Sequence, residues 1–115
     1  MNSGAVESAA RMLTSQATVY SRGMELLSEE AIAQELAGLP DWERSGDAIT
    51  TSVQLQDFRA AMLFASATGY LAEQANHHPD VTIQWNRVTL TLSTHSAGGL
   101  TAADFALAHR ISTLS

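Results

Sequence analysis

The sequence predicts an α+β domain with the order α-β-β-α-β-β-α, in which a four-stranded antiparallel sheet has helices packed on one face. Three observations lead to this prediction. Two pairs of short segments alternate apolar and polar residues around a tight turn, as β-hairpins do. Three other segments begin with capping residues and carry apolar residues at helical spacing. The chain of 115 residues is long enough for one domain with a modest core.

Residues 1–23 are small and polar and have only weak periodicity. They lack the continuous apolar stretch of a secretory signal. We expect a disordered leader or a non-native N-terminal extension here. An organellar transit peptide is the alternative, because Ser, Thr and Arg occur with a single acid, Glu7. The domain is then expected over residues 24–115.

A short helix and a hairpin are expected next. Ser28 is a suitable N-cap, with two acids in the first turn, and Gly38 ends the helical pattern. Trp42 opens a brief strand that turns back at residues 45–47. Apolar residues then alternate with polar or small ones over residues 49–55, which predicts a half-buried second strand.

The longest predicted helix starts after the capping residue Asp57 and runs from Phe58 to about Asn76. Apolar residues lie on both of its sides, and a helix of this kind is buried on both sides. A domain of this size cannot enclose it alone. We therefore predict that one side packs on the sheet and that the other forms a homodimer or homotetramer through residues 57–76.

A second hairpin is expected after Pro79. Apolar residues alternate on both arms, and a two-residue turn at Asn86-Arg87 would pair Trp85 with Val88 on one apolar face. A loop then leads to Thr101 and Asp104, whose spacing is typical of a capping box that opens the last helix.

Charge and cysteine content exclude several kinds of function. The net charge is −6, and the six basic residues are arginines scattered singly along the chain, so we expect no direct binding to nucleic acid. No apolar run is long enough to cross a bilayer, so no membrane partner is expected. The chain has no cysteine, which excludes disulfides and thiolate chemistry. We expect a cytoplasmic protein.

The residue types that could perform chemistry cluster around His77 and His78. Glu73 lies four residues before His77, so on a continuing helix the two side chains would be neighbours, and His77 would be poised as a proton donor. His78 precedes Pro79 and should leave the helical path. Strand alternation places His95 off the apolar core, where it could line a pocket.

Each of these residues also has a purely structural interpretation. A histidine at a helix end is often a cap, Asp104 alone would be a capping residue, and Trp85 alone would be a core residue. We take His109 as structural or solvated. Metal binding is not expected, because His77 and His78 diverge and no HExxH pattern occurs.

Taken together, the spacing of these residues is far more specific than any of them alone. The chain resembles the pterin-4a-carbinolamine dehydratase family over about residues 26–114. Asp57-Phe58, Ser93-Thr94-His95 and Gly99-Leu100-Thr101 add to the resemblance, whereas Ser96 and the strand at 53–55 depart from it. The resemblance rests on Glu73, His77-His78-Pro79, Trp85, His95 and Asp104 at fixed intervals.

The resemblance implies a dehydratase that converts 4a-hydroxytetrahydropterin (the 4a-carbinolamine) to quinonoid dihydropterin and water during tetrahydrobiopterin recycling. It implies acid/base catalysis by His77, His78 and His95, with no metal or organic cofactor, because the pterin is the substrate. A non-catalytic partner in dimerisation or enzyme assembly is the alternative, and a pterin-linked role without aromatic hydroxylation is a third. The substrate-binding residues implied are Glu73, His78, Pro79, Trp85, Thr94 and Asp104.

Overall fold

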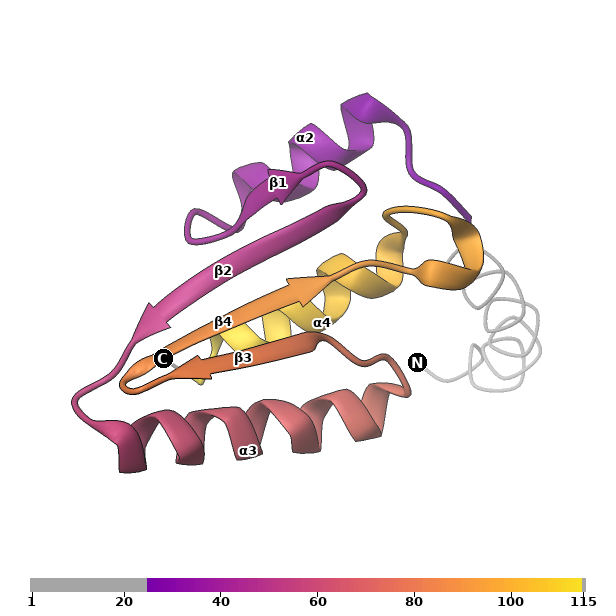
Figure 1. Cartoon of the computed structure of the whole chain (residues 1–115). Helices are drawn as coiled ribbons and strands as arrows, with labels where there is room; N and C mark the ends of the chain where they lie inside the picture. Colours follow the sequence, from indigo (N-terminus) through magenta and orange to yellow (C-terminus); the bar gives the residue numbers. More distant parts are fainter. Residues whose placement is uncertain (1–24, 115) are drawn as a thin grey trace, which may run out of the picture.

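The predicted order of elements is confirmed by the computed structural model, which describes residues 25–114 (Figure 1). The extension predicted for residues 1–23 lies outside these described residues and stays a prediction. A 3₁₀ turn, η1, precedes the last helix. The elements are α2 (Glu29–Ala37), β1 (Glu43–Ser45), β2 (Ala48–Gln54), α3 (Phe58–Ala75), β3 (Asp80–Gln84), β4 (Arg87–Leu92), η1 (His95–Ala97) and α4 (Ala102–Ser112).

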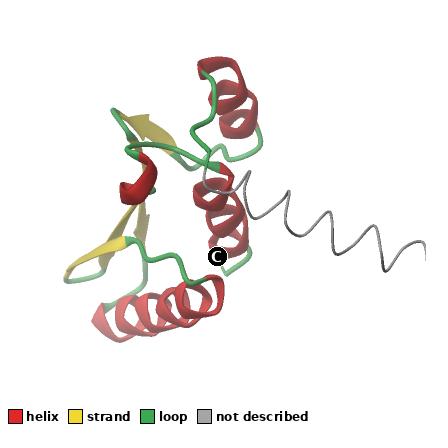
Figure 2. Ribbon diagram, turned by 90° about the vertical axis from the view of Figure 1, so that its right-hand side faces the viewer, coloured by secondary structure: helices red, strands yellow, loops and turns green. Residues whose placement is uncertain are grey.

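The four strands form one antiparallel sheet in the order β1-β2-β4-β3. The helices lie on one side of the strands (Figure 2), as predicted. Alternation along the strands sends Ile49, Val88 and Leu90 into the core and leaves Thr50 and Thr91 on the opposite face, where their hydroxyls lie 3.3 Å apart. One face of the sheet therefore carries the core and the other carries a layer of hydroxyl groups.

All three predicted N-caps are confirmed. The side chain of Ser28 accepts from the backbone N–H of Ala31, and Asp57 accepts from Ala60 in the same way at 2.8 Å. Thr101 and Asp104 form the predicted capping box at the start of α4. Local sequence thus determined where each helix begins, because these bonds join residues only two or three positions apart.

One side of α3 packs on the core and the other is exposed. Phe64 and Ala72 face the core, whereas Phe58 and Met62 are exposed. Leu63 and Tyr70 are exposed as well, so the outer side of α3 keeps a run of large apolar side chains. None of the helices within residues 25–114 is both long and apolar enough to cross a membrane.

The turn of the second hairpin differs from the prediction by one residue. Gln84 pairs with Arg87 and Ile83 pairs with Val88, so the turn residues are Trp85 and Asn86. Trp85 has a φ of 53° and is 68% exposed, so its predicted place in the core and its predicted pairing with Val88 are wrong. Asn86 decides the turn, because its side-chain N–H donates to the carbonyl of Leu55 at 3.0 Å and its own carbonyl accepts from Leu55 at 2.7 Å.

Candidate active site

The end of α3 separates His77 from Glu73. Asn76 caps the helix in the left-handed conformation, with a φ of 50°, and the backbone N–H of His77 donates to the carbonyl of Ala72 at 3.1 Å. The helix therefore stops at Ala75, and the chain turns before His77. The predicted Glu73–His77 pair is wrong, because it required the helix to continue through His77.

The structure instead pairs the two histidines with two different carboxylates. Nε2 of His77 lies 2.6 Å from Oδ1 of Asp104, which comes from the first turn of α4. Nε2 of His78 lies 2.6 Å from Oε2 of Glu73. Pro79 is half-buried and starts the turn into β3. The prediction that His77 and His78 point in different directions is confirmed.

The two pairs differ in their exposure to solvent. The side chains of His77 and Asp104 are 15% and 0% exposed, whereas those of His78 and Glu73 are 56% and 77% exposed. Water screens the second pair strongly and the first pair hardly at all. The two pairs have the same nitrogen–oxygen distance, but the His77–Asp104 pair is fixed by burial and the His78–Glu73 pair can rearrange in solvent.

Asp104 holds a small buried network together. Its Oδ2 accepts from the backbone N–H of Thr101 at 2.9 Å and from the hydroxyl of Thr94 at 2.8 Å. The hydroxyl of Thr94 also lies 2.7 Å from that of Thr101. Asp104 thus acts as a capping residue through one oxygen and contacts His77 through the other, and its predicted contact with a substrate stays a prediction.

His95 stands at the other end of this network, as the first residue of η1. Its neighbour Thr94 is buried and bonded to Asp104, which also holds His77. The backbone of Thr94 anchors the loop as well, because it pairs with Gly99 in an isolated bridge. One carboxylate thereby contacts His77 and the residue that precedes His95.

A cavity of about 350 Å³ opens beside His95. Thr91 and Ser93 line it together with His95, so the predicted position of His95 off the core is confirmed. Asp47 and Asp80 also line it, and neither was among the predicted site residues. Strand alternation could have found Asp80, because it pairs with Thr91. Among the described residues, the cavity lining holds no lysine or arginine, which disfavours phosphate-bearing ligands.

Two predicted substrate-binding residues have other surroundings. Trp85 follows the far end of β3, about 16 Å along the strand from Asp80 at 3.3 Å per residue, so the structure does not bring it to the histidines of its own chain. Thr94 is buried and its hydroxyl is engaged with Thr101 and Asp104, which suits a supporting position. Direct contact of Thr94, Pro79 or Glu73 with a substrate stays a prediction.

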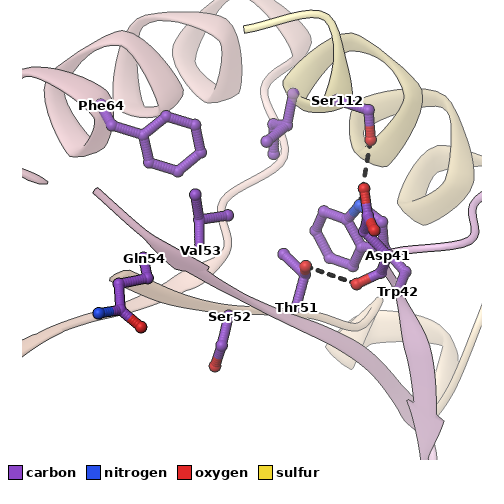
Figure 3. Close-up of a pocket in the computed structure, with 9 residues that line it drawn as sticks. Asp41, Trp42, Thr51, Ser52, Val53, Gln54, Phe64 and Ser112 are labelled. Atoms are coloured by element: carbon purple, nitrogen blue, oxygen red, sulfur yellow. Dashed lines mark hydrogen bonds between the residues drawn. The ribbon is translucent and has the colours of Figure 1, made fainter. Parts of the chain in front are cut away.

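A second cavity, of about 270 Å³, lies beside β2 between Trp42, Phe64 and the end of α4 (Figure 3). In this view Thr51 and Val53 project towards the helices, whereas Ser52 and Gln54 project away. The indole N–H of Trp42 donates to Ser112 at 3.2 Å, and Thr51 donates to the carbonyl of Asp41. No histidine lines this cavity, so the proton-transfer groups lie elsewhere.

Metal ligation has little support in residues 25–114, where no three of the His, Cys, Asp and Glu side chains gather as a metal-binding group. His109 lies outside the network and faces Glu35 at 3.7 Å. Of the three histidines in the predicted chemistry, His77 and His78 have carboxylate partners among the described residues.

The profile of the family described as "Pterin 4 alpha carbinolamine dehydratase" matches residues 25–114. This chain belongs to that family. The match covers every described element, from the segment before α2 to the end of α4.

Two curated relatives and one solved structure support this assignment, and a second solved structure shares the fold. The two relatives are each named "Putative pterin-4-alpha-carbinolamine dehydratase". The protein of Nocardia farcinica is 54% identical over 78% of this chain and 95% of its own length. The protein of Thermomicrobium roseum is 47% identical over 79% of this chain and 98% of its own length. A structure described as "transcriptional coactivator/pterin dehydratase from Brucella Melitensis" is 33% identical, with a TM-score of 0.74, over 76% of this chain and 96% of its own. A pterin dehydratase-like protein described as a RuBisCO assembly factor shares the fold at 20% identity, with a TM-score of 0.52, over 64% of this chain and 84% of its own.

Proposed function

We propose that this protein dehydrates 4a-hydroxytetrahydropterin to quinonoid dihydropterin and water by histidine acid/base catalysis, within tetrahydrobiopterin recycling in the cytoplasm. The observation that carries the proposal is the network in which Asp104 contacts both His77 and Thr94, the residue before His95. It holds the ring of His77 and the residue that precedes His95, and His95 lines a cavity. No metal or organic cofactor takes part in the proposed reaction.

The reaction needs two proton transfers. The hydroxyl on C4a becomes a good leaving group when it is protonated, and the adjacent ring N–H must give up its proton so that its electron pair forms the new C4a=N bond. The bond between C4a and oxygen breaks, and water departs. Imidazole can donate or accept a proton near neutral pH, so His77, His78 and His95 supply the groups that this reaction requires.

Stopped-flow absorbance of freshly prepared carbinolamine tests the proposal. We expect the purified protein to accelerate loss of the carbinolamine well above the buffer rate, in a manner proportional to enzyme concentration. A chelator should leave the rate unchanged, because no metal takes part. A rate equal to that of buffer alone, from folded protein, would reject the dehydratase assignment.

A second function, as a dimerisation or assembly partner of another protein, is favoured by a different feature. The outer side of α3 exposes Phe58, Met62, Leu63 and Tyr70, and apolar side chains gathered on one surface can mark an interaction site. A pull-down that recovers a stoichiometric partner, combined with no turnover of the carbinolamine, would rank this function above catalysis.

We also propose that copies of this chain associate through α3 as a dimer or tetramer. Gly69 lies on the exposed side of the helix, where an added Cβ would meet no atom of the described chain within 4 Å. Glycine in a helix interior costs about 1 kcal/mol relative to alanine, so a close approach by a second helix would explain its presence. Light scattering should give an oligomer for the natural chain and a smaller species for Leu63→Lys with Tyr70→Lys. A concentration of about 100 µM is far above the Kd of a stable dimer, so a natural chain that is monomeric at this concentration would reject the proposed association.

A further inference from the structure

Trp85 is a large apolar residue at the tip of the β3–β4 hairpin, far from the histidines of its own chain. Its side chain is 68% exposed and its φ is 53°. Bulky residues rarely adopt this left-handed conformation, for which glycine or asparagine is the usual choice. Figure 1 shows the hairpin turn at the opposite end of β3 from the segment that carries His77 and His78. An exposed residue in an unfavourable conformation gains nothing for its own domain, so contact with another molecule would explain it.

β3 is an edge strand that no other element covers within residues 25–114. The sheet order is β1-β2-β4-β3, so β3 pairs with β4 on one side only. Val81 is 42% exposed, although it pairs with the fully buried Leu90 and shares its face of the sheet. Lysine, proline or very short length protects many natural edge strands, and β3 has five residues with neither lysine nor proline. The opposite edge, β1, has only three residues. β3 therefore offers unpaired backbone groups to another strand.

The hairpin determines which backbone groups of β3 face the open edge. Gln84 closes the two-residue turn by pairing with β4, and a closing pair of this kind exchanges backbone hydrogen bonds. These groups alternate in direction along an antiparallel strand, so the groups of Thr82 and Asp80 also face β4. The N–H and C=O groups of Val81 and Ile83 then point outward, towards the open edge.

A second β3 is complementary to this edge. When two copies pair antiparallel about Thr82, Val81 of each copy lies opposite Ile83 of the other, and both have outward-facing backbone groups. Asp80 then lies opposite Gln84, so no two carboxylates face each other in a chain whose net charge is −6. This register pairs all five residues of β3, and it uses the same surface on both copies, as a two-fold interface requires. It also gives the exposed side chain of Val81 an apolar neighbour.

This register brings Trp85 of the second copy to the start of β3. The residue opposite Trp85 is Pro79, and opposed residues of antiparallel strands have Cα atoms about 5 Å apart. Along its own strand, Trp85 is about 16 Å from Asp80 at 3.3 Å per residue. Pro79 directly follows His78, and Asp80 lines the cavity beside His95. Trp85 is therefore much closer to the histidine site of the second copy than to its own.

We infer that Trp85 completes the site of a second copy of this chain when their β3 edges pair. This inference rests on the proposed dehydration and adds a binding residue to it, not a proton-transfer group. The indole offers a flat apolar face on which the planar pyrimidinone part of a pterin stacks, beside the cavity that His95 lines. Each pair of chains then holds two equivalent sites, with the histidines of one chain and the tryptophan of the other. The exposed side of α3 is a separate surface, so association through both surfaces gives a tetramer.

Mixing two defective variants tests whether Trp85 acts across chains. Trp85→Ala should lower kcat/KM about tenfold or more, because the stacking surface is lost. The double variant His78→Ala with His95→Ala should have no turnover, and both histidines are exposed, so its fold should persist. After the two variants are refolded together in equal amounts, half of the pairs are mixed, and each mixed pair has one natural site. We expect roughly one quarter of the natural activity.

The mixture has two outcomes that would overturn the inference. One is activity no greater than the mean of the two separate variants, when a tag on one variant shows that mixed pairs have formed. The other is natural turnover by Trp85→Ala alone. A tryptophan that acts within its own chain predicts the first outcome, because each site of a mixed pair would then lack either its tryptophan or its histidines.

A proline at position 81 tests the pairing of the edges. The N–H of Val81 points away from β4, so Val81→Pro removes a hydrogen bond between copies and none within the sheet. Val81→Ala is the matched control, because it shortens the same exposed side chain and keeps the N–H. We expect Val81→Pro to lower kcat/KM as far as Trp85→Ala does, and well below the value for Val81→Ala. Equal values for the two variants at position 81 would contradict the pairing.

The surroundings of Trp85 can be read without any turnover. The chain has two tryptophans, so in Trp42→Phe the fluorescence comes from Trp85 alone. We expect weak acrylamide quenching of this fluorescence, and quenching several-fold stronger when Val81→Pro is added. Equally strong quenching in both proteins would overturn the inference, whether or not the carbinolamine is turned over. If Trp85 is covered and the natural chain shows no turnover, the proposed function fails while the pairing through β3 stands.

Discussion

The contacts of His77 with Asp104 and of His78 with Glu73 have the same length, 2.6 Å, but they contribute differently to stability. The first joins a nearly buried imidazole to a fully buried carboxylate that caps α4, and the second joins two side chains that are mostly in water. Removing one member of a buried pair leaves the other uncompensated, whereas an exposed pair contributes at most about 1 kcal/mol. Adjacent residues can thus belong to a rigid part and an adaptable part of one site.

The largest effect is expected from truncating the two carboxylates in turn. Asp104→Ala should lower the free energy of unfolding by about 3 kcal/mol, because Thr94, Thr101 and His77 all lose a buried partner. Glu73→Ala should change it by no more than about 0.5 kcal/mol. Urea denaturation followed by circular dichroism measures both values. Similar losses for the two variants would remove the contrast between the pairs.

The next effect concerns catalysis at the exposed pair. His78→Ala should reduce turnover on the order of 10²-fold, if His78 transfers a proton or positions the pterin, with little change in stability. His109→Ala is the control, since His109 is also an exposed histidine beside a carboxylate, Glu35. Steady-state kinetics and thermal unfolding of both variants make the comparison. Normal turnover by His78→Ala would restrict the chemistry to His77 and His95.

A third effect concerns burial of a polar group without partners. Thr68 is fully buried in α3, and its hydroxyl has no hydrogen-bond partner in residues 25–114. Thr68→Val keeps the shape and removes the unsatisfied hydroxyl, so we expect a gain of about 1 kcal/mol in unfolding free energy. Thr51→Val is the matched control, because Thr51 is also buried but its hydroxyl donates to the carbonyl of Asp41. This substitution should lower the free energy of unfolding. Equal effects at both positions would show that partners do not matter here.

The smallest effect is expected at the exposed pair of Glu29 and Arg44, which ties α2 to β1. The hydrogen bond to Arg44 and its charge hold the pKa of Glu29 below its ordinary value of 4.5. The pair therefore stabilises the fold above pH 4.5, and this contribution is lost as the pH falls through the lowered pKa. Glu29→Gln should lower Tm slightly at pH 7, and its difference from the natural chain should shrink as the pH falls below 4.5, as differential scanning fluorimetry would show. A difference that persists at acidic pH would mean that the charge of Glu29 is not its cause.

Local patterns in the sequence were enough for much of the fold. The caps at Ser28, Asp57 and Thr101 depend on residues two or three positions away, and the strand alternation that put His95 off the core needs only its own segment. The hairpin turn was misplaced by one residue, because Asn-Arg and Trp-Asn are both weak turn formers and a long-range bond from Asn86 to Leu55 chooses between them.

The sequence by itself determined the order of the elements, the two faces of the sheet and the set of histidines and carboxylates available for chemistry, because each follows from short-range periodicity or spacing. Only the tertiary structure decided which carboxylate each histidine meets. The left-handed conformation of Asn76 ends α3 before His77, and the packing of α4 brings Asp104, 27 residues further along the chain, to its ring. A spacing of four residues predicts neighbours on a helix, and that helix had already ended.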